Sequence, residues 1–160
     1  NQELSVEKLM QHPYVHAWHD VYKSFDVNPK KYLVSFENLI KRVLDKKQIR
    51  PINAVVDIYN AISLKYMLPM GGEDLSTLMG DLELTYASSK EQSVLMLGEK
   101  ETHAPYVGEI FYKDNNGAVC RRWNWKEADR TKITQASQDV VLVVEALSVV
   151  DQSVLQTAIA

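Results

Sequence analysis

The first half of the chain repeats apolar residues at the three- and four-residue spacing of amphipathic helices. Over residues 3–25 this spacing predicts one helix, and Pro13, which suits a first helical turn, places its start near His12. The same spacing predicts a second helix over about 35–47 and a third over about 53–67. Residues before the strands are therefore expected to form a helical layer.

After Gly80 the apolar period changes from that of a helix to that of a strand. Leu82, Leu84 and Tyr86 alternate with polar residues, as in a half-buried strand, and 93–97 reads as a second short strand. Two further strands, over 108–113 and 118–125, are expected on either side of a turn formed by Asp114, Asn115, Asn116 and Gly117. This part of the chain is predicted to form antiparallel hairpins.

The last third contains the strongest strand signal. Residues 139–147 form a run rich in valine, which predicts a central strand buried on both faces. From Val150 onward the pattern is helical again. Helices, then strands, then a helix predict an α+β fold with helices layered on a mixed β-sheet. We expect an N-terminal helix over 1–27, the main domain over 28–150, and the start of a C-terminal helix over 151–160.

Composition narrows the class of protein. The chain has 160 residues, 46% of them apolar, which favours one compact domain and excludes intrinsic disorder. Cys120 is the single cysteine, which excludes a disulfide scaffold and fits a reducing, cytoplasmic location. The net charge of −3 argues against a broadly basic nucleic-acid binder, and no apolar run is long enough to span a membrane.

A histidine series in the first helix resembles a metal site. His12, His16 and His19 stand at spacings of four and three, which on a continuous helix would place them on one face. However, His12 precedes Pro13 and is expected outside the helix, and a zinc site usually draws ligands from several elements. We therefore predict no metal and no cofactor.

The third predicted helix carries a narrow polar line. Asn53, Asp57, Asn60 and Ser63 lie on one face, whereas solvent-exposed helix faces usually carry Lys and Glu. Short side chains with donors and acceptors favour a hydrogen-bonding wall of a binding cleft over a solvated face.

Gly71, Gly72, Glu73 and Asp74 follow that helix. One interpretation is structural: a glycine ends the helix in the left-handed conformation, and the acidic pair begins a short helix. The other is functional, because adjacent glycines allow a close backbone approach to a ligand and place Glu73 at its rim.

Residues 120–132 concentrate five cations and two of the three tryptophans. Strand alternation would place Arg121, Trp123 and Trp125 on one face and Arg122 and Asn124 on the other. Tryptophan beside arginine suits a stacked base with a bound phosphate.

The alternative interpretation of the same segment is structural. The tryptophans would then fill the core, and the arginines would form ion pairs with Asp129 and Glu127. Cys120 is expected to be a buried strand thiol rather than a reactive one.

Five motifs in order carry a family resemblance: 50–60, 68–74, 108–110, 121–125 and 129–131. Over about residues 33–150 the chain resembles the stand-alone B3/B4 domain family, similar to the tRNA-binding and editing module of the phenylalanyl-tRNA synthetase β subunit. That module hydrolyses mischarged tyrosyl-tRNA. The resemblance implies an α+β fold with a cleft between helices and sheet, and a trans-editing deacylase or a tRNA-binding protein as the function.

Candidate roles follow from the resemblance together with the motifs. Catalytic candidates are Asp57, Glu73 and Glu109; substrate-binding candidates are Asn53, Asn60, Ser63, Trp123, Asn124, Trp125 and Asp129; tRNA-binding candidates are Arg121, Arg122 and Arg130. The expected partner is the tRNA acceptor end or an aminoacyl-tRNA, with no membrane and no metal. In such a deacylase the residues position a water against an ester already activated by the neighbouring ribose hydroxyl.

Two departures from the family pattern bear on function. From this resemblance we expect the sequence to lack the N-terminal segment that family members usually carry before the first helix. The glycine-rich loop of the synthetase is replaced by Trp123, Asn124 and Trp125, which favours a smaller aminoacyl group over tyrosine. Two other hypotheses stay open: a non-catalytic module that binds tRNA or a small molecule, and a fragment of a longer protein with an unfinished cleft.

Overall fold

The computed structural model describes residues 5–160 and confirms the α+β class. The helices within this range are α1 (Val6–Met10), α2 (Pro13–Ser24), α3 (Ser35–Leu44), α4 (Ala54–Tyr66) and α5 (Gln152–Ile159). The strands are β1 (Met70–Asp74), β2 (Glu83–Tyr86), β3 (Val94–Leu95), β4 (Thr102–His103), β5 (Ile110–Asp114), β6 (Gly117–Arg121), β7 (Lys126–Glu127) and β8 (Val140–Val144). No helix within residues 5–160 has the length and apolar character needed to cross a membrane.

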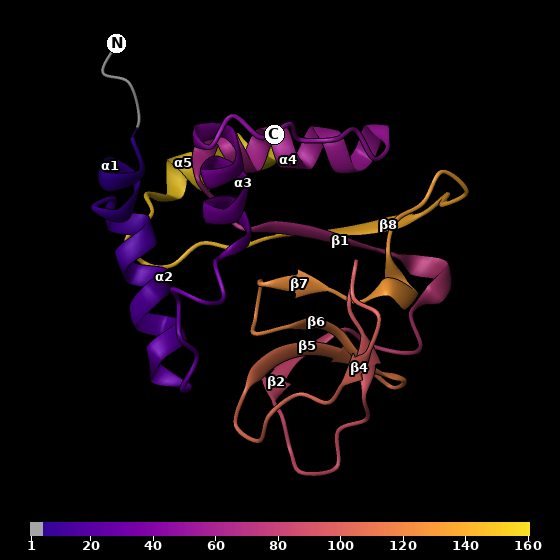
Figure 1. Ribbon diagram of the computed structural model, residues 1–160. Helices are drawn as coiled ribbons and strands as arrows, with labels where there is room; N and C mark the ends of the chain where they lie inside the picture. The colour runs from indigo at the N-terminus through magenta and orange to yellow at the C-terminus, as the bar shows by residue number, and fades with distance from the viewer. Residues whose placement is uncertain (1–4) are drawn as a thin grey trace.

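The strands form three antiparallel groups. β2, β5, β6 and β7 make a four-stranded sheet in that order, β1 pairs with β8, and β3 pairs with β4. The β1–β8 ribbon runs between helices α3, α4 and α5 on one side and the four-stranded sheet on the other (Figure 1). Bridges from Glu73 to Lys132 and from Met96 to Ala128 connect these groups. The predicted layering of helices on sheet is therefore present.

Capping residues fix the helix ends, and three predictions differ from the structure: the continuity of the helix over 3–25, the start of α3 and the end of α4. The predicted helix over 3–25 is interrupted before Pro13, and the imidazole of His12 accepts a hydrogen bond from the Tyr14 N–H (3.2 Å), so His12 is the N-cap of α2. Ser35 is the first residue of α3 rather than its cap. Met67, at φ 56°, ends α4 in the left-handed conformation that was expected of a glycine.

The run of valines in β8 was wrongly predicted as a central strand. β8 pairs only with β1 among the described strands, and the Leu142 side chain in its middle is 45% exposed. The residues of β1 opposite it include Gly71 and Gly72, which are strand residues and not a helix cap. Because glycine has no side chain, β8 packs closely onto β1 at this point; a Cβ at Gly72 would lie 2.6 Å from Leu142 Cδ2.

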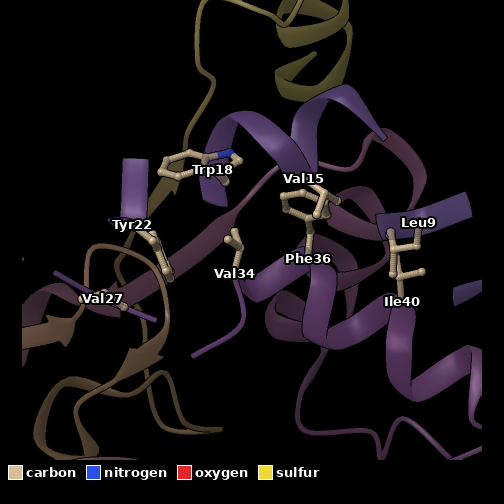
Figure 2. Close-up of a cluster of buried hydrophobic side chains, with 8 residues drawn as sticks. All are labelled: Leu9, Val15, Trp18, Tyr22, Val27, Val34, Phe36 and Ile40. Carbon is tan, nitrogen blue, oxygen red and sulfur yellow. The ribbon is translucent and has the colours of Figure 1, made fainter. Parts of the chain in front are cut away.

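The main apolar core lies between α1, α2 and α3. Figure 2 shows Val15 of α2 next to Phe36 of α3, and Leu9 of α1 next to Ile40 of α3. Within α2 the buried Val15, Trp18 and Tyr22 are three and four residues apart, and within α3 Phe36 and Ile40 are four apart, as the sequence pattern predicted. A separate buried cluster lies under the predicted β5–β6 hairpin, which is confirmed, with its turn between Asp114 and Gly117.

Candidate functional site

A partly open cavity lies where β1, β6, β7 and the end of β8 meet, and about 30 Å³ of it is accessible to water. Three carboxylates line it, from Glu73, Glu127 and Glu145, and no Lys, Arg or His side chain is among its lining residues. This volume is enough to hold a water. We call this the carboxylate cavity.

Strand pairing and one backbone hydrogen bond position the three carboxylates. Glu73 lies on β1 opposite Val141, and Glu127 lies on β7 opposite Cys120. Glu145 comes directly after β8, where its N–H donates to the carbonyl of Pro69 (3.0 Å). The three acidic residues therefore come from strands that are far apart in sequence and meet only in the folded sheet.

Glu73 and Glu127 form a proton-sharing pair. Burial, followed by repulsion from Glu127, raises the pKa of Glu73 to about 11. Burial also raises the pKa of Glu127, and the two carboxyl groups interact with each other. One oxygen of each, Oε2, is buried and has no hydrogen-bond partner among the described residues. Two carboxyls this close cannot both ionise, so the pair retains a proton at neutral pH.

Glu145 is held differently, by three donors. The Tyr112 hydroxyl donates to Oε1 (2.7 Å), the Asn124 amide donates to Oε2 (2.8 Å), and the Trp123 indole N–H also donates to Oε1. Burial still raises the pKa of Glu145. The Tyr22 hydroxyl in turn donates to Asn124 Oδ1 (2.8 Å), which connects the cavity wall to helix α2.

Cys120 also lines the cavity but is not a nucleophile. Its side chain is buried, and burial raises the pKa of the thiol well above its usual range, followed by repulsion from Glu127. A thiol that stays protonated is a poor nucleophile. The prediction of a buried strand thiol at this position is confirmed.

A second hollow, of about 590 Å³, surrounds Arg122 on the surface. Its lining comprises Lys31, Tyr32, Glu99, Lys100, Glu101, His103, Tyr106, Arg121, Arg122 and Trp125. We call it the Arg122 hollow. The strand alternation expected here is interrupted, because β6 ends at Arg121 and the next two residues adopt left-handed backbone conformations. Trp123 and Asn124 therefore line the carboxylate cavity, whereas Trp125 lines the Arg122 hollow.

The predicted polar line on α4 does not reach either hollow. Asn53 caps the helix by accepting from the Val56 N–H (3.0 Å), and Asp57 accepts from the Ile52 N–H (3.0 Å). The Ser63 hydroxyl donates to the Leu68 carbonyl (2.7 Å), and Asn60 is half-buried on the same helix. The line therefore shares neither hollow with Trp123 and Trp125, and a binding role for these residues stays a prediction.

Other candidate residues form ion pairs within the protein. Arg121 donates twice to the Glu109 carboxylate, at 2.7 and 2.8 Å, and this pair is buried. Burial favours a higher pKa for Glu109, but the hydrogen bonds and charge of Arg121 outweigh it and lower that pKa. A permanently ionised, fully paired carboxylate is not well suited to accept a proton.

The remaining candidates support the hairpin. Arg130 donates to both oxygens of Asp114 (2.6 and 3.1 Å), and Asp129 accepts from Lys132 (2.7 Å). The alternative interpretation expected ion pairs of the arginines with Asp129 and Glu127. Arg121 and Arg130 do form ion pairs, but with Glu109 and Asp114, and Arg122 forms none among the described residues.

Sequence reasoning missed Glu127 and Glu145 as site residues. Glu127 lies in a segment rich in cations, so it was interpreted as an ion-pair partner. The signal for Glu145 was present: it is a single acid that interrupts a run of β-branched residues, where a charge is costly unless it serves the fold or function.

The histidine series forms no metal site. His12 caps α2, His16 is exposed, and His19 Nε2 lies 2.9 Å from Glu37 Oε2. Within residues 5–160, no group of three or more His, Cys, Asp or Glu side chains is arranged to hold a metal ion.

Comparison with known proteins identifies the family. Curated proteins give no match to the chain. The family model described as the B3/4 domain matches residues 17–158, which include the β1–β8 ribbon, the four-stranded sheet and all three carboxylates of the cavity. Because this match covers nearly the whole chain, the protein belongs to the B3/4 domain family.

Proposed function

We propose that this protein hydrolyses the ester bond of a mischarged aminoacyl-tRNA, and that Glu73 and Glu127 activate the attacking water. One observation carries the proposal: two carboxyl groups, each with a buried oxygen that lacks a hydrogen-bond partner among the described residues, line a cavity with room for a water. A polar cavity of this size with several polar partners suits an ordered water.

The chemistry needs one acid and one base, and the pair supplies both. The ionised carboxylate of the pair removes a proton from water as its oxygen attacks the ester carbonyl carbon. The carbon–oxygen bond to the ribose then breaks, and the protonated carboxyl donates its proton to the leaving ribose oxygen. The products are a free amino acid and a tRNA with its terminal hydroxyl restored, and the pair again holds one proton.

Glu145 acts as a positioning residue in this proposal. Its three donors come from β5 and from the turn after β6, so it fixes Trp123 and Asn124 at the cavity wall. The negative charge of the cavity also favours the α-ammonium group of an aminoacyl ester, because no cation among the lining residues competes for it.

The decisive experiment measures amino acid release from a full panel of mischarged tRNAs. Glu73→Gln and Glu127→Gln are expected to lower the rate by about 10²- to 10⁴-fold, the usual contribution of acid–base groups. Glu83→Gln, the same substitution at an exposed position on β2, is the matched control and should keep the full rate. Release no faster than the uncatalysed rate across the whole panel would overturn the proposal.

A second candidate function is binding without catalysis. The acidic, cation-free lining of the cavity favours it, because such a cavity recognises an amine whether or not it cleaves the attached ester. A non-hydrolysable amide analogue of an aminoacyl-adenosine distinguishes the two. If that analogue binds to the wild-type protein while none of the charged tRNAs is hydrolysed, the protein is a binding module.

A further inference from the structure

The Arg122 side chain is buried and interacts with the charge of Glu109, but among the described residues it forms no ion pair of its own. Only 4% of the residue is exposed, yet among the described residues no hydrogen bond or ion pair is made by its guanidinium group. The nearby carboxylate of Glu109 is occupied by Arg121 and by the backbone N–H of Arg122 itself (2.9 Å). No Arg122 nitrogen is among the fully buried side-chain atoms that lack a partner within the described residues, so its N–H edge is accessible to an anion in the hollow.

Aromatic rings hold the guanidinium in place. Its central carbon lies 3.7 Å from the ring centroid of Tyr32, 4.6 Å from that of Trp125 and 5.4 Å from that of Tyr106. Stacking of this kind covers the faces of a guanidinium and leaves its N–H edge free to donate. That edge is suited to bidentate contact with a phosphate or carboxylate.

The backbone is strained to present this side chain. Arg122 and Trp123 have φ angles of 50° and 64°, in the left-handed region that few residues other than glycine adopt. Hydrogen bonds to Glu109 and to the Ile110 carbonyl (2.7 Å) hold both residues there. Consecutive strained residues beside a hollow are typical of functional sites, where the surrounding structure offsets the strain.

The charge around Arg122 is the reverse of that of the whole chain. The protein carries a net charge of −3, but the hollow is lined by two lysines and two arginines against two glutamates. Arg121 is paired with Glu109, and Glu99 is paired with Lys126 at 2.8 Å. Lys31 and Lys100 therefore add positive potential to that of Arg122, against the single remaining acid Glu101.

We propose that the Arg122 hollow binds a phosphate group of a single-stranded RNA end. This inference rests on the proposed function, since it supplies the contact for the nucleic-acid part of the substrate. Arg122 and Trp123 are consecutive, so the phosphate site adjoins the wall of the carboxylate cavity. Tyr106, at the rim and 67% exposed, offers a face on which a base can stack.

The test measures, by calorimetry, the binding of a short single-stranded RNA that ends in CCA and carries no amino acid. Arg122→Gln is expected to weaken binding by about 10- to 100-fold, the usual loss for a charged hydrogen bond. Arg42→Gln, the same substitution at an exposed position on α3, is the matched control and should bind like the wild type. Equal affinity of the Arg122→Gln and Arg42→Gln proteins would overturn the proposal.

Two further arms keep the result decisive. Arg122→Lys retains the charge but loses the planar fork, so it should bind less tightly than the wild type even if Arg122→Gln does not fold. Adenosine monophosphate and inorganic phosphate, tested alone, identify the source of the phosphate. Both should bind more weakly than the RNA; if the mononucleotide binds as tightly as the RNA, the RNA end is not the ligand.

RNA that carries no amino acid tests this proposal separately from the proposed function. If the wild type hydrolyses mischarged tRNA but its RNA affinity does not depend on Arg122, the phosphate site alone is overturned. Conversely, RNA binding that depends on Arg122 without any hydrolysis would overturn the deacylase and leave the phosphate site standing.

Discussion

The backbone of Gly71 lies directly against the carboxylate of Glu127. A Cβ at position 71 would overlap Glu127 Oε1, and the next atom of that carboxyl, Cδ, would be 3.5 Å away. Gly71 lies in strand β1 with ordinary extended geometry, so its lack of a side chain matters here for space and not for conformation. The glycine thus makes room for one half of the carboxyl pair.

Gly71→Ala is expected to move the Glu127 carboxyl away from Glu73 and to separate the pair. Hydrolysis should fall at least as far as in Glu127→Gln, while the protein stays folded, because only one flexible side chain needs to shift. Amino acid release and far-ultraviolet circular dichroism, measured on the same sample, test this. An alanine variant with wild-type hydrolysis would show that the contact does not position Glu127. Gly98→Ala is the control. Its added Cβ meets no atoms within 4 Å, but Gly98 has φ 75°, so this variant reports the effect of backbone strain without crowding.

The sequence predicted local structure well where the signal is local. The helix start near His12, just before Pro13, and the hairpin turn at Asp114–Gly117 depend on residues a few positions away, and both are found. The role of Gly71 could be predicted only in part. The sequence indicated a close backbone approach, but what approaches is Glu127, 56 positions further along, and sequence spacing carries no information about that contact.

The raised pKa values of the carboxyl pair predict a falling stability as pH rises. In the unfolded chain Glu73 loses its proton near its ordinary value of 4.5, whereas in the native protein it keeps the proton until about pH 11. Between these values the native state binds a proton that the unfolded state lacks. The free energy of unfolding should therefore fall by up to about 1.4 kcal/mol for each pH unit in this window.

Glu73→Gln should flatten this dependence, because glutamine does not titrate. Urea unfolding between about pH 6 and pH 8 is the measurement, and that range also avoids the acidic region where Glu109 and Asp114, with lowered pKa values, contribute. Glu83→Gln is again the control and should keep the wild-type slope. Parallel pH profiles for wild type and Glu73→Gln would mean that Glu73 is ionised in the native protein.

The candidate site was only half predictable for an electrostatic reason. Arg121, Arg122 and Arg130 look equivalent in the sequence, but two of them are neutralised by Glu109 and Asp114, and only Arg122 is left without an acid. Likewise, Asp57 and Glu73 are both acids in or near α4. Asp57 accepts a hydrogen bond from the Ile52 N–H, whereas Glu73 is buried beside Glu127. Pairing in three dimensions decides these roles, and composition cannot.

Arg121 is expected to matter for stability and not directly for RNA binding. Arg121→Met removes two of the hydrogen bonds to the buried carboxylate of Glu109, which should lower the free energy of unfolding by about 3–5 kcal/mol. Removing both partners in Arg121→Met/Glu109→Leu should cost less than the single change, because no carboxylate is then buried without its cation. Urea unfolding of the two variants checks the order. A double variant that is as unstable as the sum of both single variants would contradict it.

The two tryptophans of the replaced loop should respond differently to the same substitution. Trp123→Phe removes one of three donors to Glu145 but keeps an aromatic ring beside Trp18, so we expect a loss of about 1–3 kcal/mol in the free energy of unfolding.

The Trp125 indole N–H has no hydrogen bond among the described residues, and its ring packs against Arg122 and Tyr32. Trp125→Phe should therefore leave stability nearly unchanged and weaken RNA binding instead, since it loosens the aromatic support of Arg122. Unfolding and RNA titration of both variants give a crossed pattern of effects, and equal effects in both assays would mean that the two hollows are not separate in function.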